Sequence, residues 1–112
     1  MKSLGLIGFG QFGQLAAGAL KSHFDVLVAD QATGAEVTAH DLGVAFGPLE
    51  AAAACDIVVF AVPVVAMQEV FKAAAPHMLA DALAVDVGSV KMLPARWMTE
   101  ILPANVDLVA TH

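Results

Sequence analysis

Three glycines near the beginning of the chain have the spacing that a phosphate-binding loop requires. They belong to a G-x-G-x-x-G pattern made by Gly8, Phe9, Gly10, Gln11, Phe12 and Gly13. In such a loop the first glycine permits a tight turn, the second lets a pyrophosphate approach the backbone, and the third lets a helix pack close to a strand. Backbone N–H groups and the positive end of the helix dipole then bind phosphates without a lysine. The alternative is a glycine-rich turn that binds nothing.

The segments on either side favour the binding loop. Ser3–Gly8 is a short apolar run typical of a buried strand, and Gln11–Ser22 has apolar residues at the spacing of a helix. A glycine pattern of this kind is meaningful where a strand ends and a helix begins. The sequence therefore predicts a pyrophosphate site at this turn.

A carboxylate at the end of the next predicted strand, Asp25–Asp30, fits the same interpretation. Asp30 lies 17 positions after position 13, near the roughly 20 positions expected for an acid that binds the adenosine ribose. A carboxylate there would repel a 2′-phosphate, and no Lys or Arg occurs between Gln31 and Leu42 to offset the repulsion. NAD is therefore the expected cofactor and NADP is disfavoured. The alternative is that Asp30 is only a solvated turn residue.

Further candidates follow three later strands. The predicted strand Asp56–Val62 ends with Ala61 and Val62, and Pro63 follows. The proline should end the strand because it cannot donate a hydrogen bond to the sheet. These residues either line the cofactor beside the nicotinamide ribose or form an ordinary turn.

Two more strands are followed by side chains that could do chemistry. Ser89 and Lys91 follow Ala82–Val87, and His112 follows Asn105–Ala110. All three would face the same crevice. From spacing alone, Ser89 could equally be the N-cap of the next helix, Lys91 a surface charge, and His112 a residue without a role.

The order of the elements predicts the fold. Short apolar strands alternate with helical segments, and strands that are apolar on both faces belong in a parallel sheet covered on both sides. The expected fold is an α/β, Rossmann-type doubly wound sheet, mostly or all parallel, with about six strands in the order 3-2-1-4-5-6, in one domain over residues 1–112. The other predicted elements are a strand at Val44–Phe46 and helices at Thr33–Leu42 (closed by Gly43), Pro48–Cys55, Val64–Ala75 and Met92–Leu102.

Composition excludes several classes of protein. A net charge of −6 and an isoelectric point of about 4.8 argue against a nucleic-acid partner. The longest uncharged stretch, Ser3–Leu20, contains five glycines and is a poor membrane span, and a signal peptide is its less favoured interpretation. The single cysteine, Cys55, is expected to be buried and indicates a reduced, cytoplasmic setting. His23, His40 and His77 lack the spacing of metal ligands, so no metal is expected.

The whole chain resembles the N-terminal half of the prephenate/arogenate dehydrogenases of tyrosine biosynthesis. The segments that carry the resemblance are GLIGFGQFGQ, CDIVVFAVPV, VDVGSVK and ATH, and the spacing from SVK to TH is the most specific of these features. In that family a helical dimerisation domain follows, and it is expected to be absent from this chain. The resemblance therefore implies that residues 1–112 are the nucleotide-binding domain of an enzyme that is a homodimer.

The resemblance also implies roles for the late residues. His112 matches the catalytic histidine, which accepts the proton of the ring hydroxyl of prephenate or arogenate while hydride passes to the nicotinamide and CO₂ is lost. Ser89 matches the serine that orients this histidine and approaches the substrate hydroxyl, and Lys91 matches a lysine with a structural or substrate-proximal role. The arginines that bind the substrate carboxylates would come from outside the chain, so Arg96 is interpreted as a surface residue.

Two other functions stay open at this point. The chain could belong to another β-hydroxyacid-type dehydrogenase or reductase, which shares the glycine loop and the proline after strand 4, or it could be a non-catalytic dinucleotide-binding module. The isolated chain is expected to be nearly inactive. Its apolar residues, at 59%, exceed the roughly 45–50% that is usual, so an exposed apolar patch and self-association are expected when the helical domain is missing.

Overall fold

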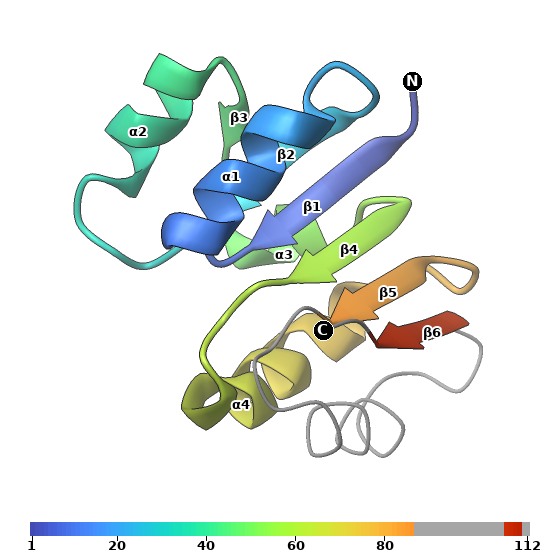
Figure 1. Ribbon diagram of the computed structural model, residues 1–112. Helices are drawn as coiled ribbons and strands as arrows, with labels where there is room; N and C mark the ends of the chain where they lie inside the picture. The colour runs from blue at the N-terminus through green and yellow to red at the C-terminus, as the bar shows by residue number, and fades with distance from the viewer. Residues whose placement is uncertain (87–106, 111–112) are drawn as a thin grey trace.

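The computed structural model describes residues 1–86 and 107–110, which form a parallel sheet with helices on both faces (Figure 1). The six strands pair in the order β3-β2-β1-β4-β5-β6, and every pairing is parallel. The predicted Rossmann-type sheet and its strand order are therefore confirmed. The strands are β1 (Ser3–Ile7), β2 (Asp25–Ala29), β3 (Ala45–Phe46), β4 (Ile57–Phe60), β5 (Leu83–Asp86) and β6 (Asp107–Ala110).

The helices of the described residues connect the strands and cover the sheet. One apolar core lies on the side of α1 and α2 and includes Leu6, Ala17 and Val28. The other lies on the side of α3 and α4 and includes Phe60 and Phe71, whose rings meet edge to face with centroids 4.7 Å apart. No helix of the described part could cross a membrane. The helices are α1 (Gln11–Leu20), α2 (Ala35–Leu42), α3 (Leu49–Ala53), α4 (Val64–Ala74) and the 3₁₀ turn η1 (Ala75–His77).

Glycine and proline set the ends of the helices. Gly43 closes α2 in the left-handed region, with φ of 86°, as predicted. The predicted start of this helix at Thr33 is wrong by two residues, because Gly34 has φ of 89° and no α-helix can run through such a residue. Pro48 immediately precedes α3, so its predicted position at the opening of that helix is confirmed.

The central strand is packed against α3 more closely than any side chain would allow. A Cβ atom built on Gly5 of β1 would lie 1.9 Å from the carbonyl oxygen of Ala52 in α3. Sequence patterns did not single out Gly5, because its partner lies 47 positions away in the chain. The contact holds α3 directly against the central strand of the sheet.

Replacing Gly5 tests this contact. Gly5→Ala is expected to lower the free energy of unfolding by about 2 kcal/mol or more, because α3 must move to make room for a methyl group. The matched control is Gly18→Ala on α1, where a Cβ atom meets nothing within 4 Å; it is expected to stabilise the protein by about 0.5–1 kcal/mol. Urea denaturation of both variants measures the difference, and equal stabilities would show that the close approach is not a constraint.

Candidate cofactor-binding site

The carboxyl ends of the strands form one continuous row across the sheet. Ala29, Ile7, Phe60, Asp86 and Ala110 are register partners in turn, from β2 through β1, β4 and β5 to β6. The chain continues from each of these residues into the segment that carries a predicted site residue. The predicted candidates therefore follow the same edge of the sheet.

A cavity of about 1320 Å³ opens at the carboxyl ends of β1, β2 and β4, where the crossovers on either side of β1 diverge. All ten residues predicted to bind the cofactor line it. They are Gly8, Phe9, Gly10, Gln11, Phe12, Gly13, Asp30, Ala61, Val62 and Pro63. The structure thus brings together three segments that are far apart in the sequence.

The glycines of the loop differ in what surrounds them. Gly8 has φ of 104°, and a Cβ atom there would lie 2.4 Å from the carbonyl oxygen of Ala61. A Cβ atom on Gly13 would lie 2.4 Å from the carbonyl oxygen of Gly8. A Cβ atom on Gly10 would meet no atom within 4 Å. Two of the glycines are therefore required by packing, whereas Gly10 borders open space on the cavity side.

Helix α1 presents an uncapped amino end at this loop. Its N-cap is Gly10, whose carbonyl oxygen accepts the N–H of Gln14 at 2.9 Å. No side-chain hydrogen bond caps the helix, and its first turn contains no acid. The first N–H groups of a helix have no partner within the helix, and the helix dipole favours negative charge beside them. This end of α1 can therefore donate to a phosphate group.

The Asp30 carboxylate is fixed by the backbone on two sides. Its Oδ2 atom accepts the N–H of Phe9 at 2.5 Å, and its Oδ1 atom accepts the N–H of Ala32 at 2.7 Å. Asp30 is therefore not merely a solvated turn residue, because it is tied to the glycine loop. A carboxylate has about four acceptor positions, so two bonds leave capacity for the hydroxyl groups of a ribose.

Among the described residues that line the cavity, the charged side chains are all acidic. Asp30, Glu36, Glu50 and Glu69 contribute carboxylates, and no Lys, Arg or His is present in this part of the lining. Within this described lining, the donors open to an anionic ligand are backbone N–H groups and the side-chain amides of Gln11 and Gln31. An additional phosphate near Asp30 and Glu36 would meet like charge.

The segment after β4 forms the opposite wall. The strand ends at Phe60, two residues earlier than predicted, although the N–H of Ala61 still donates to the carbonyl of Ile7 at 2.8 Å. Pro63 precedes the first residue of α4 and accepts the N–H of Ala66 at 2.9 Å, so it opens a helix as well as ending a strand.

The cavity also has walls that the sequence patterns did not identify. One is the turn from β3 to α3, and the other is a face of α4. The α4 residues repeat at helical spacing, which predicted a helix but not the side that meets the cavity. The added residues include Phe46, Gly47, Pro48 and Leu49, from the end of β3 to the start of α3, and Ala66, Glu69, Val70 and Ala73 from α4.

Ser89, Lys91 and His112, the candidates for chemistry, lie outside the described residues, as do Arg96 and the predicted helix Met92–Leu102. Ser89 follows Asp86 by three positions, and His112 follows Ala110 by two.

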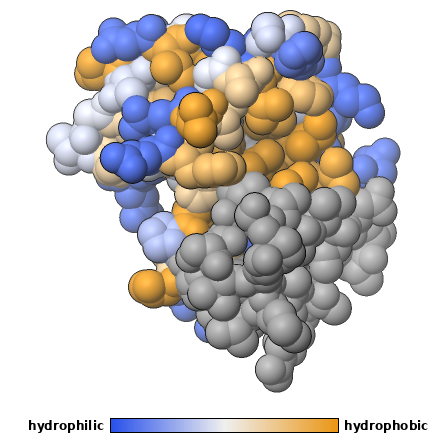
Figure 2. Space-filling view, in the orientation of Figure 1, coloured by the Kyte–Doolittle hydropathy of each residue, from blue (hydrophilic) through white to orange (hydrophobic). Residues whose placement is uncertain are grey.

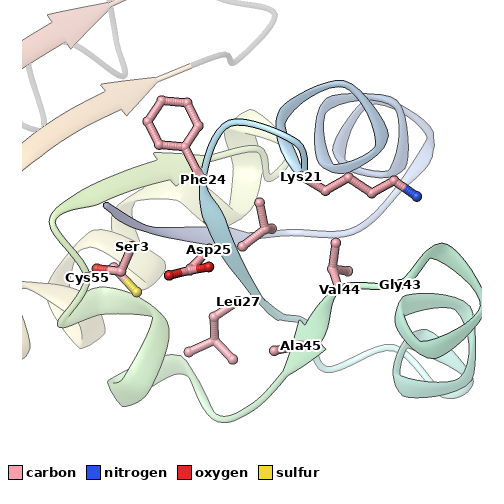
Figure 3. Close-up of a pocket in the computed structure, with 10 residues that line it drawn as sticks. Ser3, Lys21, Phe24, Asp25, Leu27, Gly43, Val44, Ala45 and Cys55 are labelled. Carbon is pink, nitrogen blue, oxygen red and sulfur yellow. The ribbon is translucent and has the colours of Figure 1, made fainter. Parts of the chain in front are cut away.

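A smaller hollow of about 390 Å³ lies at the opposite, amino-terminal edge of the sheet (Figure 3). Cys55 borders it and is buried, as expected. Burial raises the pKa of its thiol, with the Ser3 hydroxyl opposing and the Asp56 charge adding to the shift. Lys21 is engaged by the carbonyl of Leu42 at 2.7 Å. A neutral thiol is a poor nucleophile, so this hollow lacks the features of a reactive site.

No group of three His, Cys, Asp or Glu side chains that could hold a metal occurs in residues 1–86 and 107–110. The Nε2 atom of His40 lies 3.9 Å from the Oε2 atom of Glu36, and both side chains are exposed on α2.

The surface over α1 includes apolar residues (Figure 2). Phe12 and Leu15 on this helix are 53% and 72% exposed. Self-association through such residues stays a prediction.

The fold, the cavity and the glycine loop define a Rossmann-type nucleotide-binding domain. Residues 16–112 match the family model described as "Prephenate dehydrogenase, nucleotide-binding domain", and the chain belongs to this family. This confirms the family predicted from the sequence motifs.

Individual proteins are also similar to the chain. A probable arogenate/prephenate dehydrogenase of Methanocaldococcus jannaschii is 38% identical over 74 residues, which make up 64% of this chain and 17% of that protein. A conserved hypothetical protein of Sinorhizobium meliloti has a TM-score of 0.86 at 26% identity, over 98% of this chain and 40% of its own.

Prephenate dehydrogenase from A. aeolicus, in complex with hydroxyphenyl propionate and NAD⁺, has a TM-score of 0.83 at 23% identity, over 95% of this chain and 40% of its own. The chain thus spans less than half the length of these relatives.

The space around Gly10 generates a prediction. Gly10→Ala is expected to fold with almost unchanged stability but to bind a dinucleotide about tenfold more weakly, because its methyl group enters the cavity where the backbone must be approached. Gly13→Ala should instead lose about 2 kcal/mol of stability, since its methyl group meets the backbone at Gly8. Thermal unfolding and calorimetric titration with NAD separate the two effects; unaltered affinity in Gly10→Ala would contradict this role for the loop.

Proposed function

We propose that this chain is the cofactor-binding domain of an enzyme that uses NAD for the oxidative decarboxylation of prephenate or arogenate in tyrosine biosynthesis. The observation that carries the proposal is the cavity at the carboxyl edge of the sheet, with all ten predicted residues around it, in a chain of the prephenate dehydrogenase family.

The described residues fit an NAD molecule. The uncapped end of α1 at Gly10 suits the pyrophosphate, and the fixed carboxylate of Asp30 suits the adenosine ribose. Ala61, Val62 and Pro63 then lie on the side of the nicotinamide ribose. The acidic lining beside Asp30 favours NAD over NADP, because NADP carries a 2′-phosphate on that ribose.

The reaction needs a hydride acceptor, a proton acceptor and a means to hold the substrate. A nicotinamide held beside Ala61, Val62 and Pro63 would supply the acceptor for the hydride of the ring carbon that bears the hydroxyl group. His112 accepts the proton of that hydroxyl, because a neutral imidazole has one ring nitrogen that can accept a hydrogen bond and then the proton. Ser89 orients His112, and Lys91 lies near the substrate. Loss of the ring carboxylate as CO₂ then gives the aromatic ring.

The register of the sheet supports this assignment of roles. Asp86 and Ala110 are partners at the carboxyl edge, and Ser89 and His112 follow them by three and two positions. At a reach of at most roughly 3.5 Å per residue, neither position can be more than about 11 Å along the chain from this edge. In this proposal the domain acts in the cytoplasm, with a helical domain outside the 112 residues that forms the homodimer and completes the substrate site.

Cofactor choice can be tested on this chain. NAD is expected to bind at least about tenfold more tightly than NADP, because the 2′-phosphate would face like charge. The double variant Asp30→Ser, Gln31→Arg should shift the affinity ratio by about 100-fold toward NADP, since a guanidinium group binds phosphate well. The ratio is the proper readout, because Asp30 also holds the glycine loop. Gln31→Arg alone is the control, and an unchanged ratio in the double variant would show that the carboxylate does not set the choice.

Catalysis must be tested with the helical domain present. In a protein that joins residues 1–112 to such a domain, Ser89→Ala and His112→Asn are each expected to lower kcat by at least about 100-fold while NAD affinity is kept. Activity with prephenate and with arogenate identifies the substrate. Full rates in both variants would refute the catalytic assignment, and NAD binding with no turnover of either substrate would favour a non-catalytic module.

A further inference from the structure

Gln14 makes two hydrogen bonds back to the glycine loop. Its backbone N–H donates to the carbonyl of Gly10 at 2.9 Å, as a helix requires. Its side-chain Nε2 atom donates to the carbonyl of Phe9 at 3.2 Å. Gln14 is half-buried in α1 and is not part of the cavity lining. Its side chain therefore binds the loop from outside the cavity.

Phe9 is held on its other side as well. Its N–H donates to Asp30, and its side chain is 4% exposed within the core beneath α1. The peptide groups before and after Phe9 are thus each bound by a side chain, one from the end of β2 and one from α1. Phe9 is fixed more firmly than an ordinary residue of a turn.

The carbonyl of Phe9 and the N–H of Gly10 belong to the same peptide plane. In a trans peptide these two groups point in opposite directions. A hydrogen bond that holds the carbonyl against α1 therefore directs the N–H of Gly10 away from Gln14. Because Gly10 lines the cavity, an N–H that points this way can donate to a phosphate there.

Gly10 alone would not keep this plane in place. A glycine populates regions of φ and ψ that other residues avoid, so the plane between Phe9 and Gly10 can rotate at little steric cost. A Cβ atom at Gly10 would limit that rotation, but it would also occupy the space that a phosphate needs. The loop thus requires a restraint that does not fill the cavity.

We propose that Gln14 is this restraint: a positioning residue that holds the Phe9–Gly10 peptide so that the N–H of Gly10 faces the cavity before a pyrophosphate binds. The proposal rests on the proposed function of the loop as a dinucleotide site. It assigns Gln14 to phosphate binding only, since the adenosine ribose is bound by Asp30.

The test compares ligands with and without phosphate on the variant Gln14→Met. Methionine keeps the length of the side chain and the tendency to form helix, but it cannot donate a hydrogen bond. NAD and ADP should bind about three- to tenfold more weakly, the loss expected for one hydrogen bond, and adenosine should bind as it does to the unmodified chain. Calorimetry measures NAD and ADP, and ligand-observed NMR measures adenosine.

The matched control is Gln68→Met, on an exposed position of α4 outside the cavity lining, which should leave all three affinities unchanged. Gln14→Leu is a second uncharged variant without a donor and decides the matter if the methionine variant does not fold. Equal losses for adenosine, ADP and NAD would reveal general loosening and overturn the proposal, as would unchanged ADP affinity in both Gln14 variants. Failure of the unmodified chain to bind NAD would instead refute the proposed function.

Discussion

Contact between backbones around β1 is the constraint on which the rest of the structure depends. At Gly5, Gly8 and Gly13 a Cβ atom would lie 1.9–2.4 Å from a carbonyl oxygen of another residue. These contacts bring α3, the end of β4 and the start of α1 directly against the central strand. Two of them lie at the carboxyl end of β1, where the turn must also expose its N–H groups. The absence of side chains thus serves both the packing of the fold and the formation of the cavity.

This arrangement explains how an acidic chain can bind an anionic cofactor. Backbone donors and the dipole of α1 act over short distances, and the favourable effect of the dipole is confined to the first turn of the helix. No acid lies in that turn, whereas Asp30 is engaged by two backbone N–H groups. The net charge of −6 is spread over the molecule and screened by salt beyond roughly 10 Å. The placement of charge, more than its sum, determines what the cavity accepts.

Features encoded by neighbouring residues were predicted well from the sequence. The apolar strands, their order and the ten predicted residues that line the cavity follow from local patterns. Gly43 also ends its helix as expected. Features that depend on distant contacts were missed. The role of Gly5 requires knowledge of Ala52, and the side of α4 that meets the cavity is decided by how that helix sits on the sheet. The helix after β2 begins late because Gly34 adopts a left-handed conformation, which composition alone does not reveal.

The row of register partners relates the two parts of the sheet to which the proposed function gives different tasks. Phe60, Asp86 and Ala110 lie side by side, so a residue that follows β5 or β6 starts within about 10 Å of the end of β4, at roughly 4.8 Å per strand. A cofactor that extends from Asp30 across the end of β1 to Ala61 would present its nicotinamide to this part of the row. In the proposed function, the segments after β1, β2 and β4 bind the cofactor, and the segments after β5 and β6 supply the residues for the chemistry. Such a division lets many enzymes share the glycine loop while their reactions differ, and it explains why the segment with Ser89 and the end at His112 indicate the family more specifically than the glycines do.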